Sequence, residues 1–211
     1  MMTDIGLAHI ERALSLPDFD PAAALLSMAP HGRPQRRTDP PPKEAGVLLL
    51  LTRSGAAGEL GVVLTRRTDR LTGHSGQMSF PGGRRDPTDS DFEHTALRET
   101  AEELGIDTSG IAILGTLTPI YIPPSNFDVH PYVGYVPDLP PLAPNPEEVA
   151  AVYVAPLRDL LNPASRTTAH IETSAGARDV PAYLLSEQIV WGATAIMLHE
   201  FEVRLRQALA R

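Results

Sequence analysis

The chain has 211 residues, of which 42% are hydrophobic and 21% charged, and it contains no cysteine. This length suits one well-buried domain with an appendage, and the composition is that of an ordinary globular protein. The formal charge of −8 argues against binding to nucleic acid or to an anionic membrane, and the absence of cysteine excludes disulfides, thiolate nucleophiles and cysteine-ligated metals. Because the amino terminus lacks a signal-peptide pattern and the apolar run 47–51 is too short to span a bilayer, we expect a cytoplasmic protein.

The first 44 residues are predicted to form a helical extension and a linker. Apolar residues recur at helical spacing over 4–16, Pro17 ends that helix, and a second short helix is expected over 22–28. The prolines and arginines that follow indicate an extended linker. We therefore expect residues 1–44 to precede a main domain that spans 45–211.

Patterns typical of strands and short helices fill the remainder of the chain. Strands are expected at 46–52, 60–67, 111–122 and 128–136. After a proline-rich loop we expect a strand at 149–156, a helix at 157–161, short strands at 168–173 and 180–185, and a last helix over 192–210. Strands mixed with helices predict an α+β fold in which helices cover a mixed sheet.

A helix with clear start and stop signals is predicted over 91–104. Candidate N-cap residues occupy 89–91, and Gly105 stands where a left-handed C-cap belongs. One side of this helix is expected to pack against the sheet. The apolar stripe that would do so consists of Leu97, Ala101 and Leu104.

Away from that stripe, Glu99, Glu102 and Glu103 fall on one arc of the helix. Carboxylates three and four positions apart repel by about 0.2–0.5 kcal/mol per pair, and the chain's single lysine, Lys43, is distant in the sequence. Divalent cations bind where carboxylate oxygens converge, and Mg²⁺ is held by few carboxylates together with the phosphates of its substrate. From spacing alone, the arc is either a solvated face or a metal site.

The stretch before the helix, SFPGGRRDPTDSD at 79–91, predicts a strand that ends at Phe80 and then a tight turn. Pro81 blocks the strand, and the two glycines that follow can adopt backbone angles closed to other residues. Such a turn can aim a backbone carbonyl at the acidic arc. A calcium-binding loop is excluded because the twelfth residue counted from Asp86 or Asp89 is not glutamate, and a P-loop is excluded because the chain has no glycine–lysine pair.

Residues 82–106, GGRRDPTDSDFEHTALRETAEELGI, resemble the signature of the Nudix hydrolases, G-x5-E-x7-R-E-U-x-E-E-x-G-U, in which U is aliphatic. Residues 63–83 are similar to an additional motif of the coenzyme A pyrophosphatase branch, as are stretches at 129–136, 145–161 and 190–198. The resemblance implies a Nudix-like α/β/α arrangement, with a mixed sheet sandwiched between helices. It also implies a hydrolase that uses Mg²⁺ or Mn²⁺ to cleave the diphosphate of coenzyme A and its derivatives to 3′,5′-ADP and 4′-phosphopantetheine.

The chain departs from both patterns at a few positions. Asp89 stands in place of the first glutamate of the signature, one extra residue separates it from Arg98, and Thr100 replaces an aliphatic residue. The branch motif differs at Val63, Thr68 and Thr72. The change at the last of these, where arginine is usual, bears on the substrate more than on the chemistry, and Arg70 is a candidate replacement.

The resemblance and the chemistry together assign roles around the arc. Glu99, Glu102 and Glu103 are predicted to coordinate the metal, with a carbonyl of Gly83 as a further ligand. A metal-bound water loses its proton more readily than free water and can then attack phosphorus. Arg98 is predicted to orient Glu99 through a charge-assisted hydrogen bond, and the alternative is an ordinary surface arginine.

The general base is expected to be Glu148, in the loop NPEEV, or a glutamate of the helix, and the alternative reading of that loop is a solvated acidic turn. The residues predicted to act in catalysis are Arg98, Glu99, Glu103 and Glu148. The candidate phosphate-binding residues are Arg66, Arg67, Arg70 and His74. Because the chain uses arginine in place of lysine almost everywhere, an arginine cluster is a weak signal by itself.

The expected partner is a small-molecule substrate, with neither nucleic acid nor membrane, and the sequence leaves a homodimer open. A sister enzyme with the same site but another substrate, such as ADP-ribose, NADH or a dinucleotide, is the alternative within the family. From another class, the domain could sense nucleotides without cleaving them. The complete set of three glutamates argues against a pure sensor, which has no need of them.

Overall fold

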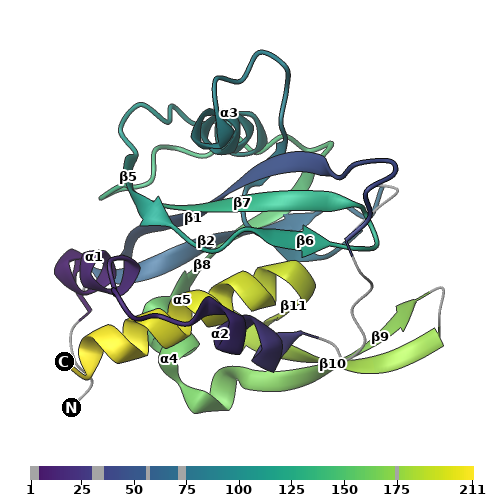
Figure 1. Cartoon of the computed structure of the whole chain (residues 1–211). Helices are drawn as coiled ribbons and strands as arrows, with labels where there is room; N and C mark the ends of the chain where they lie inside the picture. The colour runs from purple at the N-terminus through teal and green to yellow at the C-terminus, as the bar shows by residue number, and fades with distance from the viewer. Residues whose placement is uncertain (1–4, 30–35, 56–57, 71–74, 174–175) are drawn as a thin grey trace.

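The computed structural model describes residues 5–29, 36–55, 58–70, 75–173 and 176–211 (Figure 1). Its helices are α1 (Leu7–Leu14), α2 (Pro21–Met28), α3 (Phe92–Leu104), α4 (Leu157–Leu161) and α5 (Gly192–Leu209), with a short 3₁₀ turn at Pro163–Ser165. Its strands are β1 (Lys43–Ser54), β2 (Glu59–Arg67), β3 (Met78–Ser79), β4 (Gly82–Arg84), β5 (Ala112–Thr116), β6 (Ile120–Ile122), β7 (Phe127–Tyr135), β8 (Val149–Pro156), β9 (Arg166–Thr173), β10 (Gly176–Leu185) and β11 (Gln188–Trp191).

An eight-stranded mixed sheet forms the centre of the described chain, with helices on both faces (Figure 1). β1 runs parallel to β7 and antiparallel to β2 and β4. α3 lies on one face of the sheet, and α5 lies on the other with α1 and α2 packed against it. β9, β10 and β11 form a separate antiparallel sheet. The expected α+β architecture, a mixed sheet between helices, is confirmed.

Both faces of β1 are buried, which explains its continuous apolar run. Leu48 and Leu50 belong to a hydrophobic cluster with residues of α3, and Leu49 and Leu51 belong to the larger cluster on the α5 side. Successive side chains of a strand point to opposite faces, so a central strand covered on both sides needs an apolar residue at every position. β1 therefore contributes to both hydrophobic layers, one beneath α3 and the other on the α5 side.

A glycine in β1 lets α3 approach the sheet closely. A Cβ built on Gly46 would lie 2.4 Å from the carbonyl oxygen of Phe92 and 2.9 Å from the amide nitrogen of Ala96. Only a hydrogen atom fits between the strand and the helix at that distance. This close approach brings the next turn of α3, which carries Glu99, against β4.

The structure differs from the expected elements in a few places. The single strand expected over 111–122 is broken into β5 and β6, because the N–H of Thr118 donates to the carboxylate of Glu200 in α5 and Pro119 has no N–H to donate. Neither β11 nor β4, which lies where a tight turn was expected, was among the expected strands, and β1 begins before residue 45. The division of the chain at residue 44 stays a prediction. Within the described residues, no helix is both long and apolar enough to cross a membrane.

Candidate active site

A buried carboxylate, that of Asp89, anchors the loop that leads into α3. Its oxygens accept hydrogen bonds at 2.9 Å from Nε and Nη2 of Arg98, from Oγ1 of Thr95 and from the N–H of Asp86. The Asp89 side chain is fully buried, and the Arg98 guanidinium holds the pKa of this carboxyl well below its usual range. Asp89 therefore remains charged and fixes Arg98 in one orientation.

The N-cap of α3 is Asp91, one of the three candidate caps. Its carboxylate accepts a hydrogen bond from the N–H of His94 at 2.8 Å. Gly105 ends the helix in the left-handed conformation, with a φ of 65°. The sequence thus predicts the helix correctly but not the anchoring role of Asp89. The position of Asp89 in the signature, ahead of Arg98, was the one feature of the sequence that could have indicated this role.

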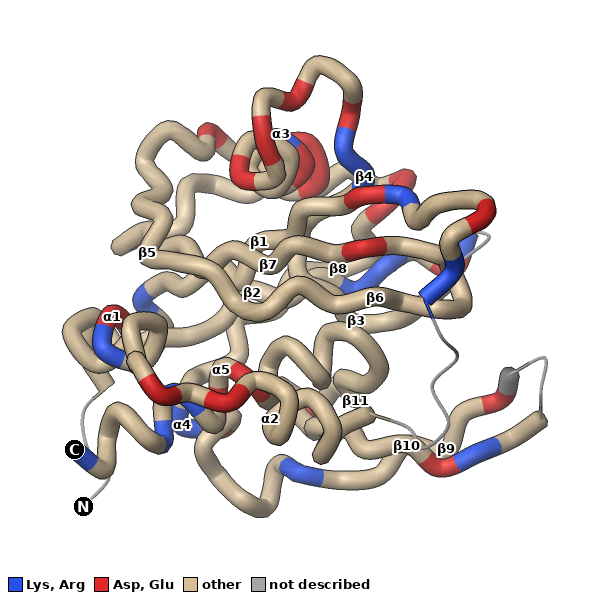
Figure 2. The backbone as a smooth tube through the Cα atoms, in the orientation of Figure 1, with Lys and Arg blue, Asp and Glu red and all other residues tan. Residues whose placement is uncertain are grey.

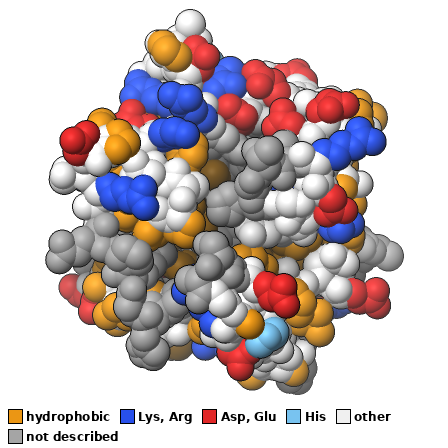
Figure 3. Space-filling model, turned by 90° about the vertical axis from the view of Figure 1, so that its right-hand side faces the viewer, with side chains coloured by type: hydrophobic (Ala, Val, Ile, Leu, Met, Phe, Trp, Pro, Cys, Tyr) orange, Lys and Arg blue, Asp and Glu red, His pale blue; other side chains and the backbone are white. Residues whose placement is uncertain are grey.

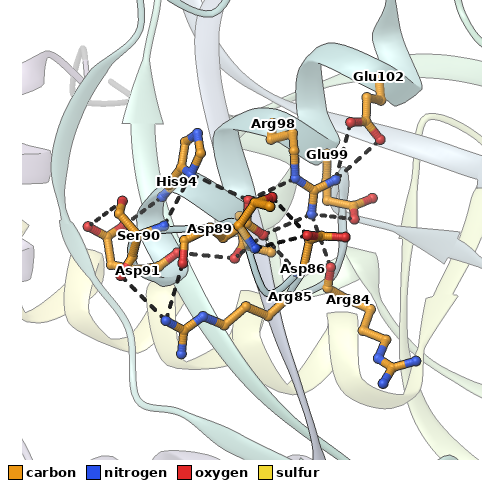
Figure 4. Close-up of polar contacts among 12 residues, drawn as sticks. Arg84, Arg85, Asp86, Asp89, Ser90, Asp91, His94, Arg98, Glu99 and Glu102 are labelled. Atoms are coloured by element: carbon orange, nitrogen blue, oxygen red, sulfur yellow. Dashed lines mark hydrogen bonds and ion pairs between the residues drawn. The ribbon is translucent and has the colours of Figure 1, made fainter.

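Arg98 connects this anchored loop to the glutamates (Figure 4). Beyond Asp89, its guanidinium lies 3.0 Å from Glu99 and 3.2 Å from Glu102, and Nη2 donates to the carbonyl oxygen of Arg84 at 3.1 Å. The side chain is 23% exposed, and its carboxylate partners raise the pKa of Arg98. These contacts place Arg98 where it can orient Glu99 and Glu102 together.

The three glutamates of the acidic arc differ in exposure. The exposed fraction of the side chain is 56% for Glu102, 15% for Glu99 and 2% for Glu103. The buried residues of α3 are Thr95, Ala96, Thr100, Glu103 and Leu104. The packed face is therefore rotated away from the predicted stripe of Leu97, Ala101 and Leu104, because the small side chains of Ala96 and Thr100 fit closest to the sheet. This rotation turns Glu103 toward the interior.

Glu103 lies beside Arg67 of β2. Nη1 of Arg67 is 3.6 Å from Oε1 of Glu103, and the N–H of Gly82 donates to the same carboxylate. Burial outweighs these contacts and raises the pKa of Glu103 to about 8. Within the described residues, Oε2 of Glu103 and Nε of Arg67 are buried without a hydrogen-bond partner. An unpaired buried carboxylate oxygen of this kind is a ready ligand for a cation.

The backbone of β4 supports Glu99 directly. A Cβ built on Gly83 would lie 2.3 Å from Oε2 of Glu99, and Gly83 is paired with Gly46 of β1. The Glu99 carboxylate therefore packs against a strand position that only glycine can occupy without displacing it. The carbonyl of Gly83 as a metal ligand stays a prediction.

We expect Gly83→Ala to lower the affinity for Mn²⁺ by about 10–100-fold while leaving the fold intact. The added methyl group would meet the flexible end of Glu99 and not the backbone, so the carboxylate moves and the strand does not. A Mn²⁺ titration monitored by electron paramagnetic resonance measures the affinity, and urea unfolding checks the fold. Gly110→Ala is the matched control, because a Cβ there meets nothing within 4 Å. Unchanged Mn²⁺ binding in Gly83→Ala would contradict the role of this contact.

A fourth carboxylate, that of Glu148, reaches the glutamates of α3 from the loop before β8. Burial raises the pKa of both Glu99 and Glu103, and the charge of Glu148 adds to the rise. Nδ2 of Asn145 donates to Oε1 of Glu148 at 3.3 Å, and the N–H of Asn145 donates to the carbonyl oxygen of Glu103 at 2.9 Å. The N–H of Thr68 donates to the carbonyl oxygen of Glu148 at 2.9 Å. This loop is therefore held against the end of α3.

We name Glu99, Glu102, Glu103 and Glu148 the carboxylate cluster. Among the described residues, no three acidic or histidine side chains are grouped closely enough to form a closed set of metal ligands. Glu102 pairs with Arg98, and Glu103 pairs with Arg67. The donor set nevertheless fits a hard dication, because every candidate ligand is an oxygen atom, the carboxylates repel one another, and Oε2 of Glu103 is buried without a partner among the described residues.

The predicted phosphate-binding arginines lie in different environments. Arg66 and Arg67 are neighbours in β2, and the pairing of β2 with β8 is irregular between them. Arg67 contacts Glu103, whereas Arg66 is 3.6 Å from Asp69. Arg70 is exposed in the turn that follows. His74 lies outside the described residues.

A groove of about 890 Å³ borders the carboxylate cluster. It is lined by Arg98 and Glu99, by residues 84–87 and by residues 41–44. Lys43, distant from α3 in the sequence, therefore lies in the same groove as Glu99. Figure 2 shows acidic residues concentrated along α3 and the loop before it, with basic residues next to β4. Figure 3 shows Lys and Arg side chains gathered beside Asp and Glu side chains on the upper part of one face.

The chain is similar to proteins of one family along most of its length. The model of the NUDIX domain matches residues 41–175. The chain belongs to the Nudix family. It is 40% identical to the human mitochondrial coenzyme A diphosphatase NUDT8 over 168 residues, which is 78% of this chain and 70% of that protein. It is 39% identical to the uncharacterized Nudix hydrolase NudL of Yersinia enterocolitica over 137 residues, which is 65% of this chain and 70% of that protein.

Solved structures share the fold of this Nudix chain. The MutT protein from Methanosarcina mazei Go1 matches with a TM-score of 0.52 and 17% identity, covering 81% of this chain and 97% of that one. The Nudix hydrolase RenU from M. smegmatis matches with a TM-score of 0.52 and 16% identity, covering 80% and 86%. At such identity the likeness shows the fold alone. The family and the sequence relatives make the protein a Nudix hydrolase, an enzyme that acts on phosphorus-containing anhydrides.

In the metal-free protein, we expect Glu103 to lower the free energy of unfolding as the pH rises from about 4.5 to about 8. Its carboxyl group has a pKa of about 8 in the folded protein and an ordinary value of 4.5, so the folded state binds more protons in this range. The stability that Glu103 contributes is complete below pH 4.5, its ordinary pKa, and is lost as the pH rises through about 8, its pKa in the folded protein. Urea unfolding in EDTA between about pH 5 and pH 9 measures this slope, and subtracting the curve of Glu103→Gln isolates Glu103 from other groups. Equal slopes in the two proteins would contradict the assignment.

Proposed function

We propose that this Nudix hydrolase cleaves the diphosphate bond of coenzyme A and its derivatives in the cytoplasm, giving 3′,5′-ADP and 4′-phosphopantetheine. The carboxylate cluster beside the groove supports the chemistry, and the observation that supports the substrate is the 40% identity to a coenzyme A diphosphatase over 78% of the chain. The branch motif at 63–83 is in keeping with the same substrate.

In this proposal Glu99, Glu102 and Glu103 hold Mg²⁺ or Mn²⁺, with the carbonyl of Gly83 as a further ligand. When bound, such an ion supplies positive charge that neutralises the diphosphate, polarises phosphorus and activates water. A bare acidic site would repel so anionic a substrate. Arg98, itself fixed by Asp89, keeps Glu99 and Glu102 in place during this reaction.

The attacking water needs a group that takes its proton, and Glu148 is the proposed general base. Asn145 donates to Oε1 of Glu148, so we assign the proton to Oε2. Arg67, which lies beside Glu103, is a proposed contact for the phosphates of the substrate, as are Arg66, Arg70 and His74. We also propose residues 45–211 as the catalytic domain and 1–44 as an extension whose last residues, 41–44, line the groove.

The test is incubation of the purified protein and Mn²⁺ with coenzyme A, NADH and ADP-ribose, followed by identification of the products by mass spectrometry. We expect coenzyme A to be consumed fastest, with 3′,5′-ADP and 4′-phosphopantetheine as products. Faster cleavage of NADH or ADP-ribose would contradict the substrate while leaving the site intact. Binding of these compounds without any cleavage would contradict the enzyme mechanism and indicate a nucleotide-sensing module.

A further inference from the structure

The loop before β8 is attached to the end of α3 through backbone hydrogen bonds. A helix leaves its last carbonyl groups without partners inside the helix. The N–H of Asn145 donates to the carbonyl oxygen of Glu103 at 2.9 Å, and the N–H of Ala143 donates to that of Leu104 at 2.9 Å. The loop, which also carries Glu148, therefore takes its position from the turn of α3 that holds Glu103.

Gly105 allows the loop to approach the helix this closely. A Cβ built on Gly105 would lie 2.2 Å from the carbonyl oxygen of Ala143, so only the hydrogen atom of a glycine fits there. The residue that ends α3 in the left-handed conformation is thus also the residue against which the loop packs.

Asn145 begins a tight turn that fixes the orientation of its own side chain. Its Oδ1 accepts a hydrogen bond from the N–H of Glu147 at 3.1 Å, and its carbonyl oxygen accepts one from the N–H of Glu148 at 3.1 Å. Because Oδ1 is used within the turn, the NH₂ group faces Glu148, and Nδ2 donates to Oε1 at 3.3 Å. Asn145 therefore contacts both the backbone of Glu103 and the carboxylate of Glu148.

Thr68 holds the backbone of the same turn from the end of β2. Its N–H donates to the carbonyl oxygen of Glu148 at 2.9 Å, and its Oγ1 donates to the carbonyl oxygen of Glu147 at 3.0 Å. Thr68 is itself buried. With the backbone fixed in this way, the freedom left to Glu148 is rotation of its side chain. Among the described residues, Asn145 supplies the one hydrogen bond that restrains this rotation.

We propose that Asn145 is a positioning residue for the hydrolysis, which holds the Glu148 carboxylate in place relative to the glutamates of α3. The inference rests on the proposed function, in which Glu148 takes the proton of the attacking water. A general base has to lie within hydrogen-bond distance of that water, and a displacement of about 1 Å can lower the rate by about 100-fold. Asn145 sets this distance because it is bonded to Glu103 as well as to Glu148.

A second Asn-Pro turn in the chain has the same geometry without a carboxylate to hold. Oδ1 of Asn162 accepts a hydrogen bond from the N–H of Ala164 at 3.1 Å, and its carbonyl oxygen accepts one from the N–H of Ser165 at 3.0 Å. The NH₂ group of Asn162 donates to no residue that the structure describes. Asn162 is therefore the matched control for Asn145.

The first test separates positioning from support of the turn. Asn145→Ser keeps an oxygen that can accept from the N–H of Glu147, adds no charge and removes the NH₂ group. It should lower kcat by about 10–100-fold and leave KM, the affinity for Mn²⁺ and the free energy of unfolding nearly unchanged. Asn145→Asp, which also repels Glu148, should lower kcat at least as far, whereas Asn162→Ser and Asn162→Asp should not change it. Steady-state kinetics, Mn²⁺ calorimetry and urea unfolding measure these quantities. An unchanged kcat in Asn145→Ser, or a loss explained by unfolding, would overturn the proposal.

A double-mutant cycle tests whether Asn145 acts through Glu148. Glu148→Gln alone should lower kcat by about 100-fold or more, and adding Asn145→Ser should then have little further effect. Full multiplication of the two effects, or a normal kcat in Glu148→Gln, would overturn the proposal.

The cycle is measured on whichever of coenzyme A, NADH and ADP-ribose the wild type cleaves fastest. If this is NADH or ADP-ribose, the proposed substrate is wrong, and the result for Asn145 stands. If wild type cleaves coenzyme A but the Asn145 variants turn over normally, the role of Asn145 is wrong and the proposed function stands. If wild type cleaves none of them, the proposed function is wrong, and the role of Asn145 in hydrolysis is overturned with it.

Discussion

Glu103→Gln should lower kcat by about 100-fold or more without loss of folding. The substitution keeps the size of the side chain but removes the charge of a carboxylate that is 2% exposed and whose Oε2 has no partner among the described residues. Because the charged form of Glu103 is penalised by burial, the metal-free variant should be at least as stable as wild type at pH 8. Steady-state kinetics at saturating Mn²⁺ and urea unfolding in EDTA measure the two effects.

Two companion variants make the result interpretable. Glu102→Gln removes the same charge from a side chain that is 56% exposed, so turnover should fall without the gain in stability. Glu172→Gln, at an exposed position of β9, should change neither quantity. If Glu103→Gln keeps near-normal turnover at saturating metal, Glu103 is not a ligand and its unpaired oxygen has only a structural role.

Asp89→Asn should reduce the free energy of unfolding by about 3 kcal/mol, and turnover should fall with it. An asparagine has one acceptor oxygen, so its NH₂ group would face an N–H of Arg98 where the second carboxylate oxygen now accepts. Arg98, released from one side, would no longer fix Glu99 and Glu102. Urea unfolding and steady-state kinetics on the same preparations test both expectations.

A second comparison separates the effect of Asp89 on stability from its effect on the position of Arg98. Asp179→Asn, at a side chain that is 72% exposed, should change stability by less than about 1 kcal/mol and leave turnover unchanged. For Asp89→Asn, the loss of turnover should persist at temperatures and urea concentrations at which the variant is fully folded. Wild-type turnover in the folded variant would show that Asp89 supports the fold but does not position Arg98 for catalysis.

The fold and the helix at the site could be predicted because they depend on local signals. Asp91 and Gly105 cap α3 through interactions within a few residues, and the signature spacing identified the family that the comparisons confirm. The prediction of a single strand over 111–122 was wrong for a non-local reason. Its interruption depends on a carboxylate from α5, Glu200, which no pattern near Thr118 reveals.

By itself, the amino-acid sequence determined the family, most of the strands and helices, and which glutamates lie close together on α3. Only the tertiary structure decided that Glu103 is buried, that Arg67 lies beside it, and that Asn145 connects it to Glu148. Helical periodicity places side chains around an axis, but it does not say which side meets the sheet. That depends on where the neighbouring strand leaves room, and here the room is left by Gly46 and Gly83.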